Sequence, residues 1–391
     1  MADTKLDKDR YSADTLTIGG EVDVEELNDR LDRDGLGRPF VAPGRRAGAR
    51  RIVTVEKGQA VPAFEALCGS GLDLRLDNLH VGGWEFMGKH WGHGFTWSEL
   101  ALLEADKPPR PPWEKLPAGL RRPVIALLDT GVEQHPWIRV GTPDDPFVIH
   151  AEEVDRPRPF PRMLPVFSPG EGPGRDAGHA TFIAGLIRSA APSARILSLQ
   201  VMDDRGKVQE SRVLEALSWL SDYAGLTGPD LGAGRPVDVV CMAFGREPDD
   251  PDPFADVENA MKPFTDAGIP LVASAGNDHT DKEVKPAASE AVIAVGAGFG
   301  RYHADFSNYG DWVNRYRDGV DVVGILPGAA VDGSEGRWGQ VERHVVRGRR
   351  LRRRPGPAAG RPRPCLTCAW ARCSNGPGTA TATRCRSWCA S

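Results

Sequence analysis

Long apolar runs are absent from this 391-residue sequence. No stretch approaches the roughly 18 apolar residues that a membrane-spanning helix requires, so no membrane partner is expected. The polar N-terminal segment MADTKLDKDRYSAD lacks the apolar core of a secretory signal peptide. We therefore expect a protein that resides in the cytoplasm.

Cysteine is scarce until the last part of the chain. Of seven cysteines, only Cys68 and Cys241 lie outside the C-terminal segment, which argues against a disulfide-held scaffold. Neither sign of charge dominates, because the formal net charge is −5, and the protein as a whole is not expected to bind nucleic acid. The composition, 40% hydrophobic and 26% charged, is that of an ordinary globular protein large enough for two domains.

Composition divides the chain into four regions. An N-terminal extension or prodomain-like region covers residues 1–105, and a proline-rich linker follows at 106–120. Region 121–335 alternates strands and helices, and 336–391 is an irregular tail rich in arginine and cysteine. Within the first region the pattern predicts a helix, a strand, a second helix and an extended segment, the last three forming a small β-α-β unit: VDVEELNDRLDRDG, RRIVTVE, AVPAFEALCGSG and DLRLDNLHVGGWEF.

Region 121–335 has the pattern of a doubly wound α/β fold. Short continuous apolar runs predict strands that are buried on both faces of a mostly parallel sheet: PVIALLDTG, ARILSLQVM, VDVVCMAFG, PLVASAGN and AVIAVGAG. The segments between them predict helices on both faces of that sheet: HATFIAGLIRSA, ESRVLEALSWLSDYA and DVENAMKPFTDAG. Functional residues of such folds lie at the carboxyl ends of the strands.

Candidate site residues occur at four such places. A carboxylate can orient an imidazole, an amide can donate a hydrogen bond into a cleft, and a strand edge can pair with an extended peptide. Taken singly, each candidate has an ordinary structural explanation: a turn residue for the Asp and the Asn, a structural or merely exposed residue for the His, and a strand followed by a turn for the last run. For the Asp, this ordinary explanation is favoured. The candidates are Asp129, His179, Asn277 and the run of Ala243, Phe244 and Gly245.

Taken together, and in this order, the motifs resemble those of the subtilisin-like serine protease family. ALLDTGVEQHP, GHATFIAGLI and VASAGND resemble its Asp, His and oxyanion motifs, and HADFSNYGDWVN with GVDVVGILPG resembles the approach to its nucleophile. The resemblance covers roughly residues 121–328 and implies a subtilisin-like α/β fold and a serine endopeptidase that acts on polypeptide substrates. It implies no cofactor and leaves open whether a structural calcium ion binds.

The resemblance also implies a role for each candidate. His179 would be the general base that takes the serine proton, and Asp129 would orient its ring. Asn277 would donate a hydrogen bond to the tetrahedral oxyanion. Ala243, Phe244 and Gly245 would line the primary specificity pocket and bind substrate as an added strand.

Two positions and one region qualify the resemblance. Ala180 and Phe182 replace the usual Gly and second His of the histidine motif, and both would alter packing behind His179 rather than proton transfer. The N-terminal region stands where this family can carry an inhibitory prodomain. A regulatory or purely structural extension is an equally open interpretation.

The nucleophilic serine that the family places after GVDVVGILPG is missing. Ser334 is the only serine in the expected window, and it lies in the polar turn DGSEG with no apolar helix after it. We therefore expect a chain that is inactive or truncated as a peptidase. The alternative is a pseudoprotease or peptide-binding module that uses the same cleft.

The tail has several interpretations. A frameshift would explain the many arginines of the tail, because arginine codons of the CGN type, read one base later, encode Ala, Val, Gly, Asp or Glu. Codons for Val345–Arg349 can be chosen that, in the shifted frame, encode Ser-Phe-Ala-Ala-Ala. A zinc knuckle at CLTC is disfavoured because no histidine lies among the irregularly spaced cysteines. A nucleic-acid arm is disfavoured because aromatic residues are sparse. An unfolded tail without function is favoured.

Overall fold

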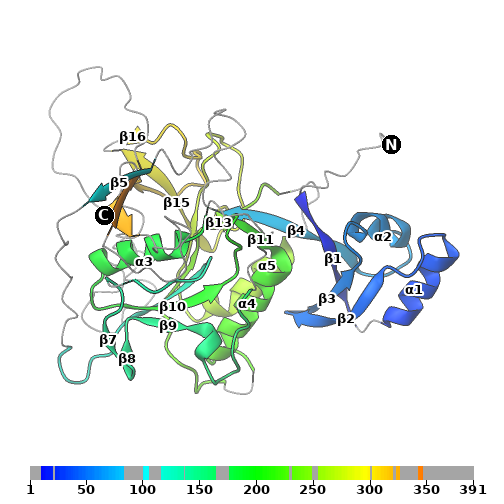
Figure 1. Ribbon diagram of the computed structural model, residues 1–391, viewed down its shortest axis with the longest axis horizontal. Helices are drawn as coiled ribbons and strands as arrows, with labels where there is room; N and C mark the ends of the chain where they lie inside the picture. The colour runs from blue at the N-terminus through cyan, green and yellow to red at the C-terminus, as the bar shows by residue number, and fades with distance from the viewer. Residues whose placement is uncertain are drawn as a thin grey trace.

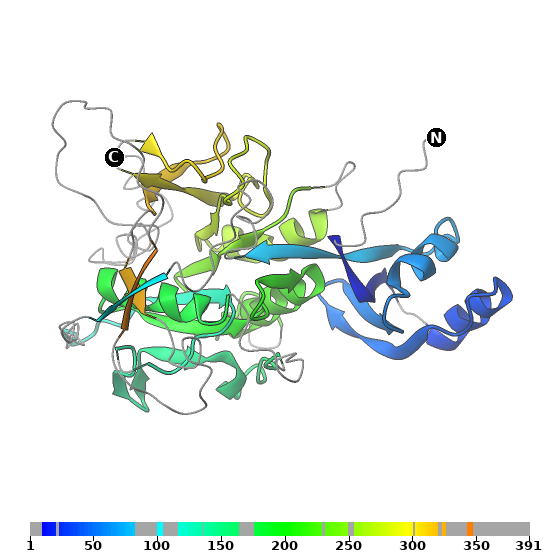
Figure 2. The same cartoon turned by 45° about the horizontal axis from the view of Figure 1, so that its top comes forward.

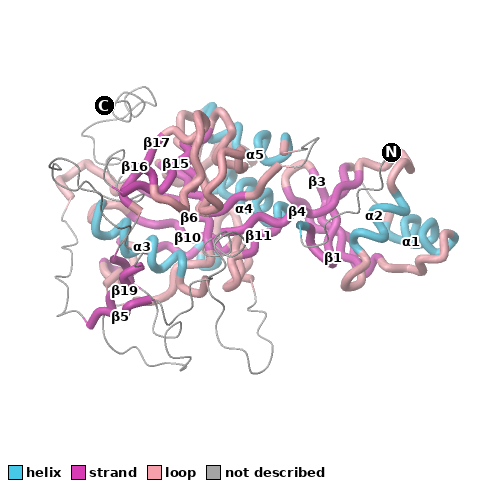
Figure 3. Tube along the Cα trace, turned by 90° about the horizontal axis from the view of Figure 1, so that it is seen from above, coloured by secondary structure: helices cyan, strands magenta, loops and turns pink. Residues whose placement is uncertain are grey.

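A computed structural model shows an N-terminal lobe at one end and a larger body at the other (Figures 1 and 3). Residues 106–115 of the linker predicted at 106–120 lie outside the described residues. The structure describes residues 10–20, 23–82, 100–104, 116–135, 137–163, 176–228, 231–248, 254–299, 302–319, 323–325 and 342–346.

A mostly parallel sheet forms the centre of the larger body (Figure 2). Its strand order is β16-β15-β14-β12-β6-β10-β9, with β17 beside β15, and only the β15–β16 pair is antiparallel. The predicted doubly wound sheet is therefore confirmed. The bounds are β6 (Val124–Asp129), β9 (Val148–His150), β10 (Arg195–Gln200), β12 (Val239–Met242), β14 (Leu271–Ser274), β15 (Val292–Phe299), β16 (Tyr302–His303) and β17 (Arg315–Asp318).

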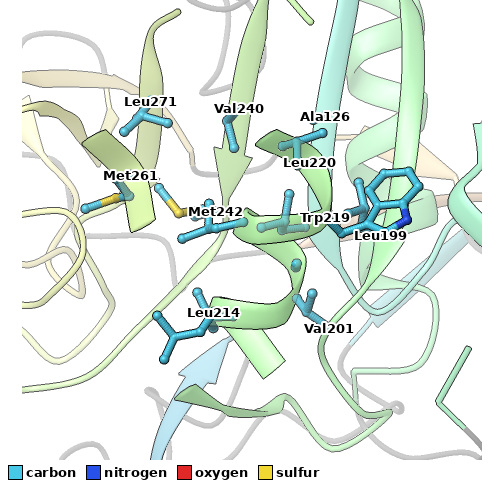
Figure 4. Close-up of a cluster of buried hydrophobic side chains, with 14 of the residues drawn as sticks. Ala126, Leu199, Val201, Leu214, Trp219, Leu220, Val240, Met242, Met261 and Leu271 are labelled. Carbon is cyan, nitrogen blue, oxygen red and sulfur yellow. The ribbon is translucent and has the colours of Figure 1, made fainter. Parts of the chain in front are cut away.

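Helices cover both faces of this sheet because its strands are apolar on both sides. All six residues of β6 are buried. Ile125 and Leu127 of β6 pack in one cluster with α3 (His179–Ala190). Ala126 and Leu128 pack in the opposite cluster with α4 (Glu210–Tyr223) and α5 (Ala255–Asp266), where Trp219 and Met261 lie (Figure 4). Among the described residues, no helix is both long and apolar enough to cross a membrane.

Helix α3 packs closely against β18 (Val323–Ile325), as its small residues predict. Ala180 and Ala184 are fully buried. A Cβ atom added to Gly185 would lie 2.5 Å from Cγ1 of Ile325, and one added to Gly324 would lie 2.4 Å from the Phe182 ring. The Phe182 ring therefore lies against β18.

The N-terminal lobe contains more strands than the sequence predicted. Strand β3 (Arg50–Val55), helix α2 (Ala60–Leu67) and strand β4 (Leu74–Gly82) form the expected β-α-β unit. Both of its strands pair antiparallel with β1, which lies between them. The elements that complete the lobe are β1 (Tyr11–Gly19), α1 (Val24–Arg33) and β2 (Phe40–Ala47).

Strands β1 and β2 were missed because their apolar pattern is interrupted. Leu16 and Ile18 of β1 are fully buried, but the preceding residues are polar and the register with β4 shifts there. β2 contains Pro43 and Gly44, and its register with β3 shifts twice. Such irregular strands give a weak alternation signal.

Strand β4 belongs to both parts of the protein. Its first half pairs with β1, and its last residues pair antiparallel with β11 (Lys207–Gln209) and β13 (Phe244–Gly245) of the larger body. Figure 1 shows β4 running from the lobe to these strands. Arg50 and Arg75 of the lobe form ion pairs with Asp256 at the start of α5.

A small sheet contains part of the predicted tail. β19 (Glu342–Val346) pairs antiparallel with both β18 and β5 (Leu100–Glu104). The expectation of an irregular tail is therefore wrong for these five residues, where the valines at the end of ERHVV favour a strand. The other tail residues lie outside the described ranges.

The remaining short elements are β7 (Gly141–Thr142), β8 (Asp145–Pro146) and the 3-10 helix η4 (Ala151–Glu153).

Candidate active site

Asp129 and His179 meet at the carboxyl end of β6. Asp129 is the last residue of that strand and is fully buried. Nδ1 of His179 lies 2.9 and 3.0 Å from the two carboxylate oxygens of Asp129. Because an ionised carboxylate only accepts hydrogen bonds, the His179 ring carries hydrogen on Nδ1 and directs Nε2 away from Asp129.

Local backbone geometry fixes both side chains. Gly178 has φ of 85°, which lets the chain turn sharply into α3 so that His179 is its first residue. Thr130 links the two segments, since its amide donates to Asp129 Oδ1 and its hydroxyl accepts from the Ala180 amide at 3.1 Å. The geometry therefore holds the imidazole in one orientation.

The electrostatics of the pair favour the protonated ring. Burial on its own would lower the pKa of His179. The charge of Asp129 and the hydrogen bond to it outweigh burial, with a smaller contribution from Asp176, and raise this pKa from 6.5 to about 9. The His179 side chain is still 20% exposed, so a reacting group can reach it.

Neither Cys241 nor Ser334 is supported as an alternative nucleophile. Burial and the charge of Asp129 raise the pKa of the Cys241 thiol well above its ordinary value, so Cys241 is not a thiolate. Within the described residues, the hydrogen bonds of the His179 ring go to Asp129 alone. Ser334, which sequence context disfavours, lies outside those residues.

Asn277 lies at the same edge of the sheet. It follows β14, which is separated from β6 by β12. Gly276 before it has φ of 100°, a conformation that other residues rarely adopt. A buried side chain, Asn308, fixes this turn by donating to Ala275 O at 2.8 Å and accepting from the Asp278 amide at 2.8 Å. Sequence reasoning missed Asn308, although it lies in the quoted segment HADFSNYG.

Phe244 and Gly245 form β13, which follows Ala243 directly after β12. In the structure this edge pairs with an extended segment of the chain itself, since Phe244 is opposite Gly82 and Gly245 is opposite Val81. On the other side of that segment, the Gly82 amide donates to Gly206 O at 2.7 Å. An extended peptide strand therefore lies between β11 and β13.

A buried polar cluster beside this strand was also missed. Nε2 of His80 on β4 lies 3.0 Å from Oε2 of Glu210, the first residue of α4, and Arg246 Nε donates to the same oxygen at 2.9 Å. No local pattern identifies these residues, because His80 and Glu210 are 130 positions apart. Among the described residues, no group of three His, Cys, Asp or Glu side chains could hold a metal ion.

Comparison with known proteins agrees with this geometry. The family model described as the Subtilase family, Peptidase S8, matches residues 121–334. Because this match covers more than half of the chain, the protein belongs to the subtilase family.

Individual relatives are more distant. The chain is 31% identical over 164 residues to subtilisin-like protease 6 of Arthroderma benhamiae, across 40% of this chain and 38% of that protein. It is 28% identical over 216 residues to subtilisin BL of Lederbergia lenta, across 52% of this chain and 66% of that protein. It thus spans less than two-thirds of the length of either relative.

Two solved structures align with lower identity. A cold-adapted subtilisin-like serine proteinase aligns with 19% identity and a TM-score of 0.40, over 58% of this chain and 70% of that one. The prenylagaramide maturation protease PagA aligns with 22% identity and a TM-score of 0.38, over 53% and 66%.

Proposed function

We propose that this chain carries the cleft of a subtilisin-type serine endopeptidase, which hydrolyses polypeptide substrates through an acyl-enzyme. One observation carries the proposal: the hydrogen-bonded pair of Asp129 and His179 lies at the sheet edge where β13 pairs with an extended strand. In its neutral form, His179 takes the proton of an attacking alcohol through Nε2, and Asp129 holds the required tautomer and stabilises the imidazolium that forms. Asn277 donates to the developing oxyanion.

The sequence contains no suitable serine in the context where the family places its nucleophile, so no residue is identified that supplies the attacking alcohol. The polypeptide as written therefore turns over little or no peptide. The test compares hydrolysis of a fluorogenic peptide by the full chain and by His179→Ala, and we expect the same background rate from both. Turnover that disappears in His179→Ala would overturn the expected inactivity and support the role of His179.

The frameshift interpretation of the tail has its own test. Sequencing the gene across codons 335–355 reads the alternative frame directly. A Ser-Phe-Ala-Ala reading in that frame supports the idea that a nucleophile was lost, and its absence removes the idea.

The second candidate function is a peptide-binding module or pseudoprotease that uses the same cleft. The position of β4 between β11 and β13 favours it, because this cleft holds an extended strand without a nucleophile being identified. This function predicts peptide binding without cleavage, and binding that His179→Ala leaves unchanged.

The same strand supports an inhibitory role for the N-terminal region. While β4 pairs with β13, a substrate strand cannot pair with Phe244 and Gly245. The variant Val81→Pro removes the amide at a paired position and is expected to increase the binding of an added peptide. Unchanged peptide binding in this variant would contradict inhibition by β4.

A further inference from the structure

The pocket that receives His80 is built from charged and aromatic side chains. His80 is fully buried, and its ring makes a T-shaped contact with Phe244 at 5.7 Å between centroids, with the Phe254 ring at 6.2 Å. Its Nε2 atom is 3.0 Å from Glu210 Oε2. An imidazole therefore meets two aromatic rings and one carboxylate. We call this group of Glu210, Arg246, Phe244 and Phe254 the imidazole pocket.

The carboxylate in this pocket stays ionised. Burial on its own would raise the pKa of Glu210, but the hydrogen bond and charge of His80, together with Arg246, lower it to about 2. Arg246 is itself 5% exposed, and its guanidinium lies 5.3 Å from the centre of the Phe254 ring. Arg246 balances the charge of Glu210, so the pocket offers a hydrogen-bond acceptor at little net charge.

The chemistry of the occupant follows from this balance. An imidazole can donate from Nε2 and place its flat ring against the two aromatic side chains. A phenyl ring would match the shape but would take a donor away from a buried carboxylate. A lysine could also donate to Glu210, but its flexible stem would contact the two rings less well than a flat imidazole does.

Gly82, two residues beyond His80 on β4, indicates a second requirement for a peptide bound at this place. A Cβ atom added to Gly82 would lie 2.3 Å from Cε of Met202 and 3.0 Å from the carbonyl oxygen of Ala243. Met202 can shift, but the Ala243 oxygen belongs to the backbone between β12 and β13. The position opposite Phe244 therefore favours glycine.

We propose that the imidazole pocket is a specificity subsite, and that the cleft selects extended polypeptides with the sequence His-x-Gly, whose histidine enters the pocket and whose glycine lies opposite Phe244. The proposal rests on the proposed function, since it names the substrate class of the same cleft. Glu210 is its specificity-determining residue, and the segment His80–Gly82 is the chain's own example of the sequence.

A binding experiment tests the substrate class. The full chain with His80→Ala, which weakens its own strand in the cleft, is titrated with the labelled peptides Leu-His-Val-Gly-Gly and Leu-Phe-Val-Gly-Gly in a fluorescence anisotropy assay. We expect the histidine peptide to bind about tenfold more tightly, because only it donates to Glu210. Equal binding of the two peptides would overturn the proposal.

The variant Glu210→Gln removes the charge while keeping the shape of the side chain. It is expected to bring the ratio of the two affinities close to one. Glu215→Gln is the matched control, because Glu215 lies on the same helix but pairs with Arg212. A preference for histidine that survives Glu210→Gln would also overturn the proposal.

An intramolecular measurement needs neither added peptide nor hydrolysis. Hydrogen exchange of the Gly82 amide, which donates to Gly206 O, reports how firmly β4 occupies the cleft. We expect His80→Phe to accelerate this exchange about tenfold in the parent chain and to have little effect in the Glu210→Gln chain. Equal effects in both chains would refute the subsite.

The two measurements separate this proposal from the proposed function. Equal binding of the two peptides, together with a His179 pKa that Asp129→Asn lowers, would overturn the subsite alone. A retained histidine preference, together with a His179 pKa that Asp129→Asn leaves unchanged, would overturn the proposed catalytic pair alone.

Discussion

The carboxylate of Asp77 on β4 caps the first turn of α4 through Ser211, which is 134 positions further along the chain. The Ser211 amide donates to Oδ1 at 2.9 Å, and its hydroxyl donates to Oδ2 at 2.6 Å. Thr15 of β1 donates to the same oxygen at 2.8 Å. The N-terminal lobe thereby provides the N-terminal cap of a helix in the larger body, so the two parts stabilise each other.

Asp77 makes this contact dependent on pH. Burial raises the pKa of Asp77 from 3.8 to about 6, despite the hydrogen bonds from Ser211 and Thr15. The folded protein thus holds a proton that the unfolded chain has released, and the free energy of unfolding falls as the pH rises from 3.8 through about 6. We expect Asp77→Asn to flatten this dependence in chemical denaturation, whereas Asp32→Asn, at an exposed site, should leave it unchanged. A parallel pH dependence in Asp77→Asn would contradict the assignment.

The His179–Asp129 pair predicts a second pH dependence. The pKa of His179 is raised to about 9, so the pair stabilises the fold fully below pH 6.5 and loses this contribution as the pH rises through about 9. Asp129→Asn should lower the pKa of His179 in an NMR titration of its ring. It should also destabilise the protein more below pH 6.5 than above about pH 9.

Asp281→Asn, at an exposed position, is the control for that titration. An unchanged His179 pKa in Asp129→Asn would show that another group determines it.

Asn308 is expected to hold the Asn277 turn in place. Asn308→Ala leaves Ala275 O and the Asp278 amide without this partner, and we expect the free energy of unfolding to fall by about 1–3 kcal/mol. Urea denaturation measures the change. Asp305→Ala, an exposed substitution in the same loop, should shift it much less. Similar midpoints for the two variants would count against this role.

Gly185 is expected to tolerate no branched side chain. In Gly185→Val, the new atoms meet Ile325 at the contact between α3 and β18, and overpacking of this kind costs about 1–3 kcal/mol. Thermal unfolding should show a lower midpoint than that of Ser189→Ala, an exposed control on the same helix. A midpoint equal to that of the control would mean that β18 moves away without cost.

The parallel sheet could be predicted because its strands are buried on both faces. A strand such as β6, with all six residues buried, appears in the sequence as an unbroken apolar run. β1 and β2 leave no such run, since their pairing is irregular and β2 contains Pro43 and Gly44. The extended shape of residues 74–82 was predicted, but pairing partners more than a hundred positions away were not.

The residues of the site differ in the same way, because some of them lie in short recognisable motifs and others do not. Asp129 and His179 are each next to the strand end or helix start that positions them, so short motifs carry the signal. Glu210, Arg246 and His80 lie on three separate segments and meet only where β4 lies between β11 and β13. Their charges look like ordinary surface charges in the sequence, and only folding shows that they are buried.

The covalent connection of β4 to the rest of the chain has a quantitative consequence for any ligand. A tethered strand competes at an effective concentration on the order of millimolar, even when its contacts are no better than those of a free peptide. A visiting peptide with equal contacts must therefore exceed that concentration to displace it. Dilute peptides are therefore expected to bind little unless the connection of β4 to the rest of the chain is cleaved or the contacts of β4 are weakened.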